Sequence, residues 1–463
     1  MTERITFDLD LIKRYDKSGP RYTSYPTAPQ MQTSLGEADY RKVALQTNEG
    51  DAARPLSLYF HLPFCNTVCY YCGCNKIVTK DRSRARPYLD RLAKEIELQG
   101  ELYDRARPVT QLHWGGGTPT FISHDEMQQL MEQTGRHFSL LPDDEGEYSI
   151  ELDPREVKPG TIPFLRKLGF NRMSMGVQDF DPRVQKAVNR IQPESDTLSV
   201  LREARQHGFQ SINMDLIYGL PFQSVESFAR TLEKIIDAEP DRLSVFNYAH
   251  LPEMFKPQRR INEADLPAPS AKLEILQMVI EKLTGAGYQY IGMDHFAKPE
   301  DELAIAQKNG TLYRNFQGYS THADCDLVGM GLTSISMVGN SYWQNLKTEK
   351  EYYERLDSDR LPVFRGLVMT RDDEIRRAVI MELICHFRLD FGRIEKQFKI
   401  EFSDYFAAEL DGLNSMEQDG LLEMSESGLR VTGKGILLIR NICMIFDAYI
   451  PTLRQTGQFS KVI

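Results

Sequence analysis

The sequence has little of what marks membrane, exported or nucleic-acid-binding proteins. It contains no run of about eighteen apolar residues, and residues 1–27 carry charges every few positions with no apolar core, so neither a membrane span nor an export signal is expected. Basic side chains are also too few, because 56 Lys and Arg against 66 Asp and Glu give a formal net charge of −10. This balance provides no general positive field for a nucleic-acid backbone. We expect neither a membrane nor nucleic acid as a partner.

Cysteine is scarce as well, with seven residues in 463, and its distribution does not match a secreted disulfide framework. Three cysteines are scattered among apolar neighbours and are predicted to be buried thiols: Cys325, Cys385 and Cys443. The other four lie within ten residues of one another: Cys65, Cys69, Cys72 and Cys74. A reducing, cytoplasmic compartment is therefore expected.

No G-x-G-x-x-G follows the first predicted strand, so a dinucleotide-binding fold is not indicated. Instead, β-branched and aromatic runs alternate with amphipathic stretches. The predicted strands are 56–61, 111–114, 148–152, 172–177, 212–218 and 243–248. The predicted helices between them include 88–103, 124–138, 196–207 and 224–238. Repeated strand–helix units imply an α/β fold with a parallel sheet, and six units favour a partial (β/α)6 barrel of the TIM type.

The chain is longer than one hydrophobic core usually organises, and its 41% hydrophobic and 26% charged residues are typical of a globular enzyme. We predict an N-terminal arm over 1–50, a barrel domain with its extension over 51–345, and a smaller, mostly helical C-terminal domain over 346–463. Within the last of these, 372–387 and 435–446 are predicted helices and 420–433 is a predicted hairpin.

Polar and glycine-rich motifs stand at or just after four of the predicted strand ends, where barrel enzymes carry their chemistry. They are His-Leu-Pro-Phe-Cys at 61–65, Gly-Gly-Gly-Thr-Pro at 115–119, Glu-Leu-Asp-Pro at 151–154 and Gly-Val-Gln-Asp at 176–179. We expect these motifs to meet at one rim of the barrel.

The first motif opens a C-x3-C-x2-C loop formed by Cys65, Cys69 and Cys72. Three neighbouring thiolates can hold three irons of a [4Fe–4S] cluster and leave the fourth iron open, which is what catalysis needs. The alternative is a zinc loop completed by Cys74, although paired Cys knuckles farther apart are the commoner zinc signature.

This loop, followed by the Gly-Gly-Gly-Thr-Pro motif, resembles the radical S-adenosylmethionine superfamily. Further motifs resemble the oxygen-independent coproporphyrinogen III oxidase family within it. They lie at 19–27, 59–61, 72–76, 153–156, 215–221, 244–252, 292–296 and 315–319. The resemblance covers essentially the whole chain.

The resemblance implies a six-unit barrel with one cluster and two S-adenosylmethionine molecules, in an enzyme that converts two propionates of coproporphyrinogen III to vinyl groups. A propionate β-carbon has no nearby electron sink, so abstraction of a hydrogen atom by a 5′-deoxyadenosyl radical is a reasonable route. By resemblance, the first S-adenosylmethionine lies near Tyr59, Gly116, Glu151 and Ile335. The second would contact Tyr71, Gly117, Thr118, Gln178, Arg190, Asp215 and Ala249. Tyr71 departs from the phenylalanine expected before the third cysteine but keeps an aromatic face.

Four residues are candidates for a direct part in the reaction: Cys74, His61, Arg21 and Tyr22. Each has a plainer alternative, namely a spare loop thiol for Cys74, support of the loop for His61, and an arm packed for stability for Arg21 and Tyr22. Arginine pairs with carboxylates through two nitrogens, which would suit a propionate. A flavodoxin- or ferredoxin-like electron donor and a further electron acceptor are implied as partners, and the sequence is compatible with a monomer.

Two rival functions remain open at this point. A heme or porphyrin carrier resembling these enzymes would keep the cluster loop without decarboxylation, but such carriers typically lack both Cys74 and the 21–25 segment. A radical enzyme acting on transfer RNA is disfavoured by the acidic net charge and by the absence of a basic appended domain.

Overall fold

The computed structural model describes residues 4–49 and 53–450. The chain forms two compact units. The barrel unit consists of Met31–Ala286 and Asp324–Val368, and the terminal unit consists of Met1–Gln30, Gly287–Ala323 and Met369–Ile463. The three predicted segments do not coincide with these units, because the internal segment 287–323 groups with the two ends of the chain.

The barrel unit is built on six parallel strands, as the sequence predicts. They are β1 (Leu56–Leu62), β4 (Pro108–Gly116), β6 (Glu147–Leu152), β7 (Arg172–Gln178), β8 (Ser211–Tyr218) and β9 (Arg242–Asn247). Neighbours pair in parallel in the order β9, β8, β7, β6, β4, β1. The partial (β/α)6 barrel is therefore confirmed.

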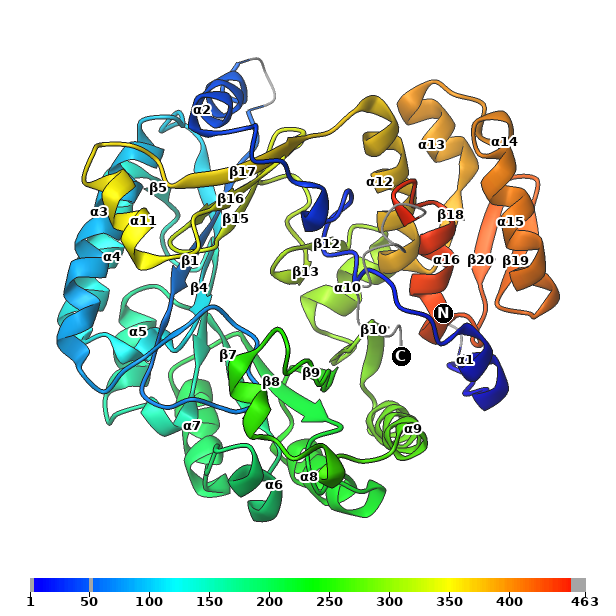
Figure 1. Cartoon of the computed structure of the whole chain (residues 1–463), viewed down its shortest axis with the longest axis horizontal. Coiled ribbons are helices and arrows are strands. Elements are labelled where there is room, and N and C mark those ends of the chain that lie inside the picture. The colour runs from blue at the N-terminus through cyan, green and yellow to red at the C-terminus, as the bar shows by residue number, and fades with distance from the viewer. Residues whose placement is uncertain (1–3, 50–52, 451–463) are drawn as a thin grey trace. The chain divides into compact units, whose positions relative to one another are not determined.

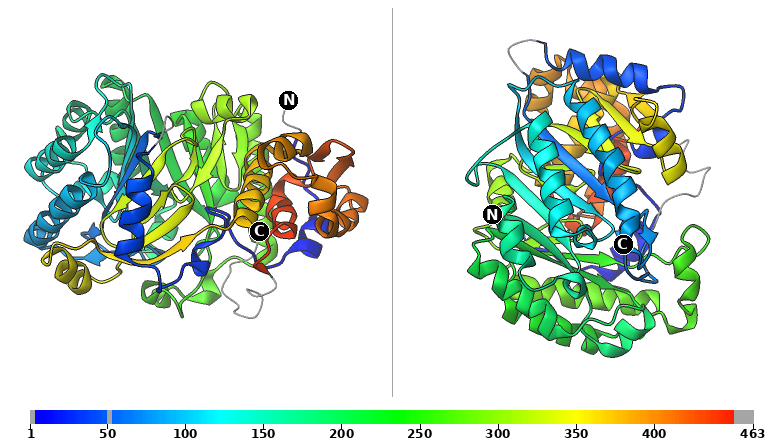
Figure 2. Two further views of the ribbon diagram at one scale, coloured as in Figure 1. Left: turned by 90° about the horizontal axis from the view of Figure 1, so that it is seen from above. Right: turned by 90° about the vertical axis from the view of Figure 1, so that its left-hand side faces the viewer.

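Helices cover the outside of this curved sheet (Figure 1). They are α3 (Ala85–Gly100), α4 (His124–His137), α5 (Thr161–Lys167), α6 (Pro182–Ala187), α7 (Glu194–Gln206), α8 (Val225–Ala238) and α9 (Pro269–Gly285). Figure 2 (right) looks onto part of this layer, where α3 and α4 face the viewer. Helix α4 begins at a capping box in which Ser123 and Glu126 satisfy each other's backbone N–H groups. Because helices cover one face and side chains fill the other, central residues such as Phe60 and Trp114 have no exposed surface.

The sheet continues on the far side of β1, which the sequence did not predict. Strand β14 (Asp326–Met330) pairs in parallel with β1, and β15 (Ile335–Val338), β16 (Ser341–Asn345) and β17 (Val363–Val368) follow as antiparallel neighbours. Helices α2 (Glu37–Gln46) and α11 (Glu349–Leu356) accompany this extension, and the short β5 (Ser139–Leu140) pairs with β4.

The terminal unit is mostly helical, and so is its C-terminal segment from Met369 on, which lies within the 346–463 region predicted to be mostly helical. Its helices are α1 (Leu9–Tyr15), α10 (Glu302–Asn309), α12 (Arg371–His386), α13 (Phe391–Phe398), α14 (Phe402–Tyr405), α15 (Ala407–Gln418) and α16 (Ile439–Ile445). Its strands form short antiparallel pairings: β10 (Gln289–Gly292) with β11 (His295–Ala297), β12 (Tyr313–Asn315) with β13 (Gly318–Ser320), and β20 (Gly428–Val431) with β18 (Arg388–Asp390) and β19 (Leu422–Ser425). The predicted helices 372–387 and 435–446 and the hairpin 420–433 are all found within one or two residues, except that the last helix begins as a short 3-10 turn.

Within residues 4–49 and 53–450, no helix combines the length and the apolar composition needed to cross a membrane.

Candidate active site

The cysteine loop is anchored directly beyond β1. Two short parallel strands, β2 (Phe64–Cys65) and β3 (Ile77–Val78), hold its two ends together. The backbone N–H of Thr79 donates to the Cys65 carbonyl at 2.9 Å, and the N–H of Cys72 donates to the Cys69 carbonyl at 3.2 Å. The loop therefore has a closed base that presents its thiols at the strand end, as the motif predicts.

Donors and cations surround the loop thiols. Arg190 Nη1 lies 3.6 Å and Arg155 Nη2 lies 3.7 Å from Cys69 Sγ, and the Thr118 hydroxyl donates to Cys65 Sγ at 3.8 Å. A hydrogen bond from Cys74 lowers the pKa of Cys72 to about 5, whereas burial raises the pKa of Cys65 to about 11. Positive charge beside sulfur favours the thiolate, which is the form that binds iron.

The donor set fits an iron–sulfur cluster better than a single zinc ion. Among the described residues, the loop cysteines do not form a group of three ligand atoms within 4.8 Å of one another. One ion would require such a compact group, whereas a cubane of four irons separates the sulfurs that hold it. Cys65, Cys69 and Cys72 therefore fit the cluster.

Arg190, Arg155 and Asp153 form a buried ion-pair network next to the loop. Asp153 Oδ2 accepts from Arg155 Nη2 at 2.6 Å and from Arg190 Nη1 at 3.0 Å. Arg190 also donates to the Gly176 carbonyl at 2.7 Å. The network links the ends of β6 and β7 to Cys69. The sequence alone gives the 153–156 motif no role, because only the tertiary structure brings Asp153 and Arg190 together.

Asp215 and Arg190 are both predicted at the second S-adenosylmethionine site. Asp215, however, lies in a different polar cluster on β8. Its carboxylate accepts from Ser174 Oγ at 3.0 Å and from Asn213 Nδ2 at 2.8 Å. Burial raises the pKa of Asp215 to about 6. The ion-pair partner of Arg190 is thus Asp153, and Asp215 remains a carboxylate without a cation among its hydrogen-bond partners in the described chain.

Glu151 stands at the centre of the predicted first S-adenosylmethionine site. Its Oε2 accepts from the Gly116 backbone N–H at 3.0 Å, and its Oε1 lies 3.4 Å from His113 Nε2. Burial acts to raise the pKa of Glu151, but the hydrogen bonds from His113 and Gly116 bring it below its usual value. Although surrounding atoms desolvate the carboxylate, 43% of the Glu151 side-chain surface remains accessible. An ionised and reachable carboxylate can accept from ribose hydroxyl groups.

The rings of Tyr59, His61 and His113 lie near one another beside this carboxylate. The Tyr59 ring stacks on the His113 ring at a centroid distance of 5.8 Å and an interplanar angle of 12°. The Tyr59 hydroxyl lies 3.1 Å from His61 Nδ1, and His61 Nε2 donates to the Asn75 carbonyl at 2.9 Å. His61 therefore ties β1 to the end of the cysteine loop. His113 was missed by sequence reasoning, because its position beside Glu151 depends on strand register.

The glycines at 115–117 are required by close approach. A Cβ atom on Gly117 would lie 2.6 Å from the Phe64 carbonyl oxygen, and one on Gly116, whose φ is 110°, would lie 2.6 Å from the His61 ring. The triple glycine therefore lets the end of β4 pack directly under the cysteine loop.

The remaining predicted cofactor residues lie at ends of elements in the same unit. Tyr71 packs against a cluster that includes Val188 and Leu220, and its carbonyl accepts from Gln258 Nε2 at 3.0 Å. The others are Thr118 after β4, Gln178 at the end of β7, Ala249 after β9 and Ile335 at the start of β15. All predicted cofactor residues thus belong to the barrel unit.

Arg21 and Tyr22 belong to the terminal unit. Arg21 forms an ion pair with Asp294 at 2.9 Å. The Tyr22 hydroxyl donates to Asp447 at 2.9 Å, and Tyr22 is buried. Both side chains already have partners within their own unit, and their contact with substrate stays a prediction.

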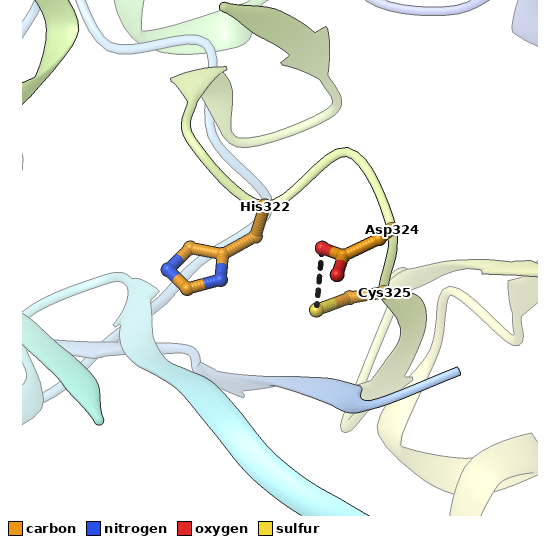
Figure 3. A group of neighbouring side chains, drawn as sticks. All are labelled: His322, Asp324 and Cys325. Atoms are coloured by element: carbon orange, nitrogen blue, oxygen red, sulfur yellow. Dashed lines mark hydrogen bonds between the residues drawn. The ribbon is translucent and has the colours of Figure 1, made fainter. Parts of the chain in front are cut away.

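The three scattered cysteines are buried, as predicted. Figure 3 shows the loop that carries one of them, in which the Cys325 thiol donates to Asp324 at 3.9 Å. Cys325 Sγ also lies 3.2 Å from the Thr110 hydroxyl. None of the three lies on the cysteine loop.

Comparison with known proteins finds similar chains over the full length. The Radical SAM superfamily model matches residues 59–235, and the HemN C-terminal domain model matches residues 369–438. The oxygen-independent coproporphyrinogen III oxidase of Pseudomonas aeruginosa is 54% identical over 463 residues, covering 100% of both chains. That of Escherichia coli (strain K12) is 52% identical over 461 residues, covering 100% of this chain and 99% of its own. The solved structure of coproporphyrinogen III oxidase (HemN) from Escherichia coli, described as a radical SAM enzyme, matches with a TM-score of 0.92 at 51% identity, covering 96% of this chain and 100% of that chain.

Proposed function

The chain belongs to the oxygen-independent coproporphyrinogen III oxidase family of the radical S-adenosylmethionine superfamily, and we propose from this premise that it decarboxylates two propionates of coproporphyrinogen III to vinyl groups, giving protoporphyrinogen IX. The observation that carries the proposal is the cysteine loop, closed at its base and flanked by Arg155, Arg190 and Thr118. The rival function of a porphyrin carrier receives no support from the relatives, which are named as oxidases.

The enzyme uses a [4Fe–4S] cluster and S-adenosylmethionine. When bound, they supply reductive cleavage of S-adenosylmethionine to methionine and a 5′-deoxyadenosyl radical that takes a hydrogen atom from the substrate. For each propionate, the substrate then loses carbon dioxide and one electron, which leaves the vinyl group. Two S-adenosylmethionine molecules are consumed for the two propionates.

The residues of the chain hold and orient these groups. Cys65, Cys69 and Cys72 hold the cluster through their thiolates, and the Arg155 and Arg190 guanidinium groups next to Cys69 stabilise that negative charge. Glu151, held by Gly116 and His113, accepts from the ribose of the first S-adenosylmethionine. Tyr59 and Ile335 complete that site.

The second S-adenosylmethionine site is proposed at Tyr71, Gly117, Thr118, Gln178, Arg190, Asp215 and Ala249. Because Arg190 Nη1 pairs with Asp153 and Nη2 donates to the Gly176 carbonyl, Arg190 would contact a bound carboxylate through its Nε atom. The Asp215 carboxylate is the acceptor there for an amine or a hydroxyl.

The partners that exchange electrons with the enzyme follow from the chemistry. Cluster reduction requires a low-potential donor, for which we propose a flavodoxin- or ferredoxin-like protein, and the electron from the substrate requires an acceptor. The cytosol suits both the reduced thiols and such donors.

The decisive experiment is an anaerobic assay with a reductant, S-adenosylmethionine, coproporphyrinogen III and an electron acceptor from cell extract. The expected result is 5′-deoxyadenosine together with vinyl product, from protein that carries about four irons per chain. Absence of both products with an intact cluster would contradict the proposal. Transfer of heme without cleavage of S-adenosylmethionine would favour the carrier.

A further inference from the structure

The turn that follows β6 contacts the cysteine loop at two points. It is the 3-10 turn Pro154–Glu156. Arg155 Nη2 lies 3.7 Å from Cys69 Sγ, and the Glu156 carboxylate accepts from Asn66 Nδ2, which lies between the first two cysteines of the loop. All of these residues belong to the barrel unit. The turn therefore contacts a cluster thiol directly and is attached to the loop that carries it.

Arg155 is held in this position by its neighbour Asp153. Its Nε donates to Asp153 Oδ1 at 2.9 Å, its Nη2 donates to Oδ2 at 2.6 Å, and its backbone N–H donates to Oδ1 at 3.1 Å. A guanidinium bound through two nitrogens to one carboxylate has a fixed orientation. The Arg155 side chain is 17% exposed and Cys69 is 8% exposed, so water screens the contact between them weakly. The positive charge of Arg155 is thus fixed beside Cys69 in a poorly hydrated place.

Cys69 has two cations as neighbours. Arg155 and Arg190 lie 3.7 and 3.6 Å from Cys69 Sγ, and they share the Asp153 carboxylate as their counter-ion. One carboxylate balances only one of the two guanidinium charges. The other charge remains available to the thiolate of Cys69.

The other charged groups near the loop do not remove this excess. Lys76 acts on the Cys72 thiol and donates to the Cys72 carbonyl at 3.0 Å, and the Glu151 carboxylate acts on Cys74. Glu156 pairs with an arginine of its own at 3.2 Å. Three cations therefore face two carboxylates around the loop thiols, and two of the three cations contact Cys69.

The excess of positive charge matters for electron uptake. One-electron reduction adds one negative charge to a [4Fe–4S] cluster, with the electron coming from the low-potential donor and no bond formed or broken. A cation fixed beside a ligand sulfur stabilises the reduced form more than the oxidised form. Charge and hydrogen bonds at the sulfurs are among the factors that set the reduction potentials of such clusters.

We propose that Arg155, oriented by Asp153, raises the reduction potential of the cluster through Cys69 and so sets how readily the electron donor can reduce it. The inference rests on the proposed function for the cluster and for a donor of low potential. Arg190 contributes to the same effect, but it is also expected at the second S-adenosylmethionine site, so Arg155 is the residue to test. Arg155 is a positioning residue that acts through Cys69, and no contact with substrate is attributed to it.

The main test replaces Arg155 with glutamine, which can still donate a hydrogen bond but carries no charge. The measurement is an anaerobic redox titration of the cluster-loaded protein, followed by EPR spectroscopy of the reduced cluster. At a fixed solution potential, Arg155→Gln should shift the ratio of reduced to oxidised cluster about tenfold toward the oxidised form, which is a midpoint about 59 mV lower for one electron. The iron content should remain at about four per chain, because the three thiolates are intact. An unchanged midpoint, or loss of the cluster, would overturn the proposal.

Two further variants separate the effect of charge at Cys69 from a general effect of substitution. Arg155→Lys keeps a cation beside Cys69, so its midpoint should stay closer to that of the original protein than to that of Arg155→Gln. Arg82 pairs with Glu156 and lies over the Phe121 ring, and neither is a cluster ligand. Arg82→Gln should therefore change the ratio of reduced to oxidised cluster less than about twofold. Equal midpoints in Arg155→Lys and Arg155→Gln, or an equal shift in Arg82→Gln, would overturn the proposal.

A cleavage assay connects the potential with the supply of electrons. With a reductant near the midpoint of the cluster, Arg155→Gln should form 5′-deoxyadenosine about tenfold more slowly than the original protein. An excess of a stronger reductant, titanium(III) citrate, should restore most of the rate. A defect that persists with titanium(III) citrate would overturn the proposal, because it would place Arg155 in S-adenosylmethionine binding or in the reaction itself.

The redox titration keeps this inference separate from the proposed function, because it uses no porphyrinogen. A cluster-loaded protein that forms no vinyl product would contradict the proposed function, while the midpoints of the variants would still test Arg155. Normal vinyl formation together with identical midpoints in the original protein and Arg155→Gln would overturn the assignment of Arg155 alone.

Discussion

Buried arginines in the two units differ in what surrounds them. In the barrel unit, Arg107 pairs with Asp326 at 2.5 Å and Arg190 pairs with Asp153 at 3.0 Å, so each buried cation has a carboxylate from the same unit. In the terminal unit, Arg314 is buried as deeply, and its one favourable contact within residues 4–49 and 53–450 is the face of the Tyr319 ring. Among the described residues, these two buried arginines of the barrel unit are thus neutralised by carboxylates, whereas Arg314 is stabilised by an aromatic ring.

The largest expected effect concerns the thiols. If the cluster belongs to the barrel unit, Cys72→Ala should lose most of its iron and its S-adenosylmethionine cleavage should fall by more than about a thousandfold, because two cysteines cannot hold the cubane. Iron content and 5′-deoxyadenosine formation measure this. The matched variant Cys443→Ala removes a buried thiol of the terminal unit and should retain both. Loss of iron in the Cys443 variant would break the comparison.

The next effect concerns stability. Arg107→Met leaves the Asp326 carboxylate buried without its cation, which should cost about 3–5 kcal/mol of unfolding free energy. Denaturant unfolding measures this cost, and Arg314→Met, which removes a contact with an aromatic ring, serves as the counterpart with a smaller expected loss. Similar losses in the two variants would mean that both units pair their buried arginines internally.

A smaller effect concerns the carboxylate at the first S-adenosylmethionine site. Glu151→Gln keeps the shape but exchanges a charged acceptor for a neutral one, so S-adenosylmethionine affinity should fall about tenfold. Equilibrium binding to the cluster-loaded protein provides the measurement. Glu147→Gln, on the same strand, serves as control and should bind normally. An unchanged affinity in Glu151→Gln would remove this residue from the site.

The last effect concerns Glu95, which, like Asp215, is a carboxylate of the barrel unit with neutral hydrogen-bond partners in the described chain. This buried carboxylate accepts from the Gly331 N–H at 2.8 Å and from Asn345 Nδ2 at 2.6 Å but has no cation among its hydrogen-bond partners. Burial raises its pKa from 4.5 to about 7. The folded protein therefore holds this proton more tightly than the unfolded chain, and the contribution of Glu95 makes stability fall as the pH rises from about 4.5 to about 7.

Glu95→Gln should reduce that fall, which is measured as the difference in unfolding free energy between pH 5 and pH 7.5. Glu97→Gln changes a more exposed residue two positions along the same helix and should leave the difference as it was. An identical pH dependence in Glu95→Gln and the original protein would contradict the prediction.

Some elements of this molecule can be predicted from local sequence patterns, and others depend on tertiary contacts. The six parallel strands were predictable because apolar runs of strand length alternate with amphipathic helices, and β1 and β8 begin and end within one residue of the prediction. The antiparallel extension from β15 to β17 was not predictable, since its short strands lie among loops that carry no comparable periodicity. The grouping of 287–323 with both ends of the chain was also invisible along the sequence.

The same division holds for the site. The sequence by itself determined the chemistry, because C-x3-C-x2-C and the triple glycine are contiguous patterns whose spacing carries the function. The charge partners were decided only by the tertiary structure. It pairs Asp153 with Arg190 and His113 with Glu151, and among the described residues it leaves Arg314 Nε and Nη1 without an acceptor. The electrostatic energy of two charged groups depends on their separation and their burial. For residues far apart in the sequence, both quantities are set only when the chain folds.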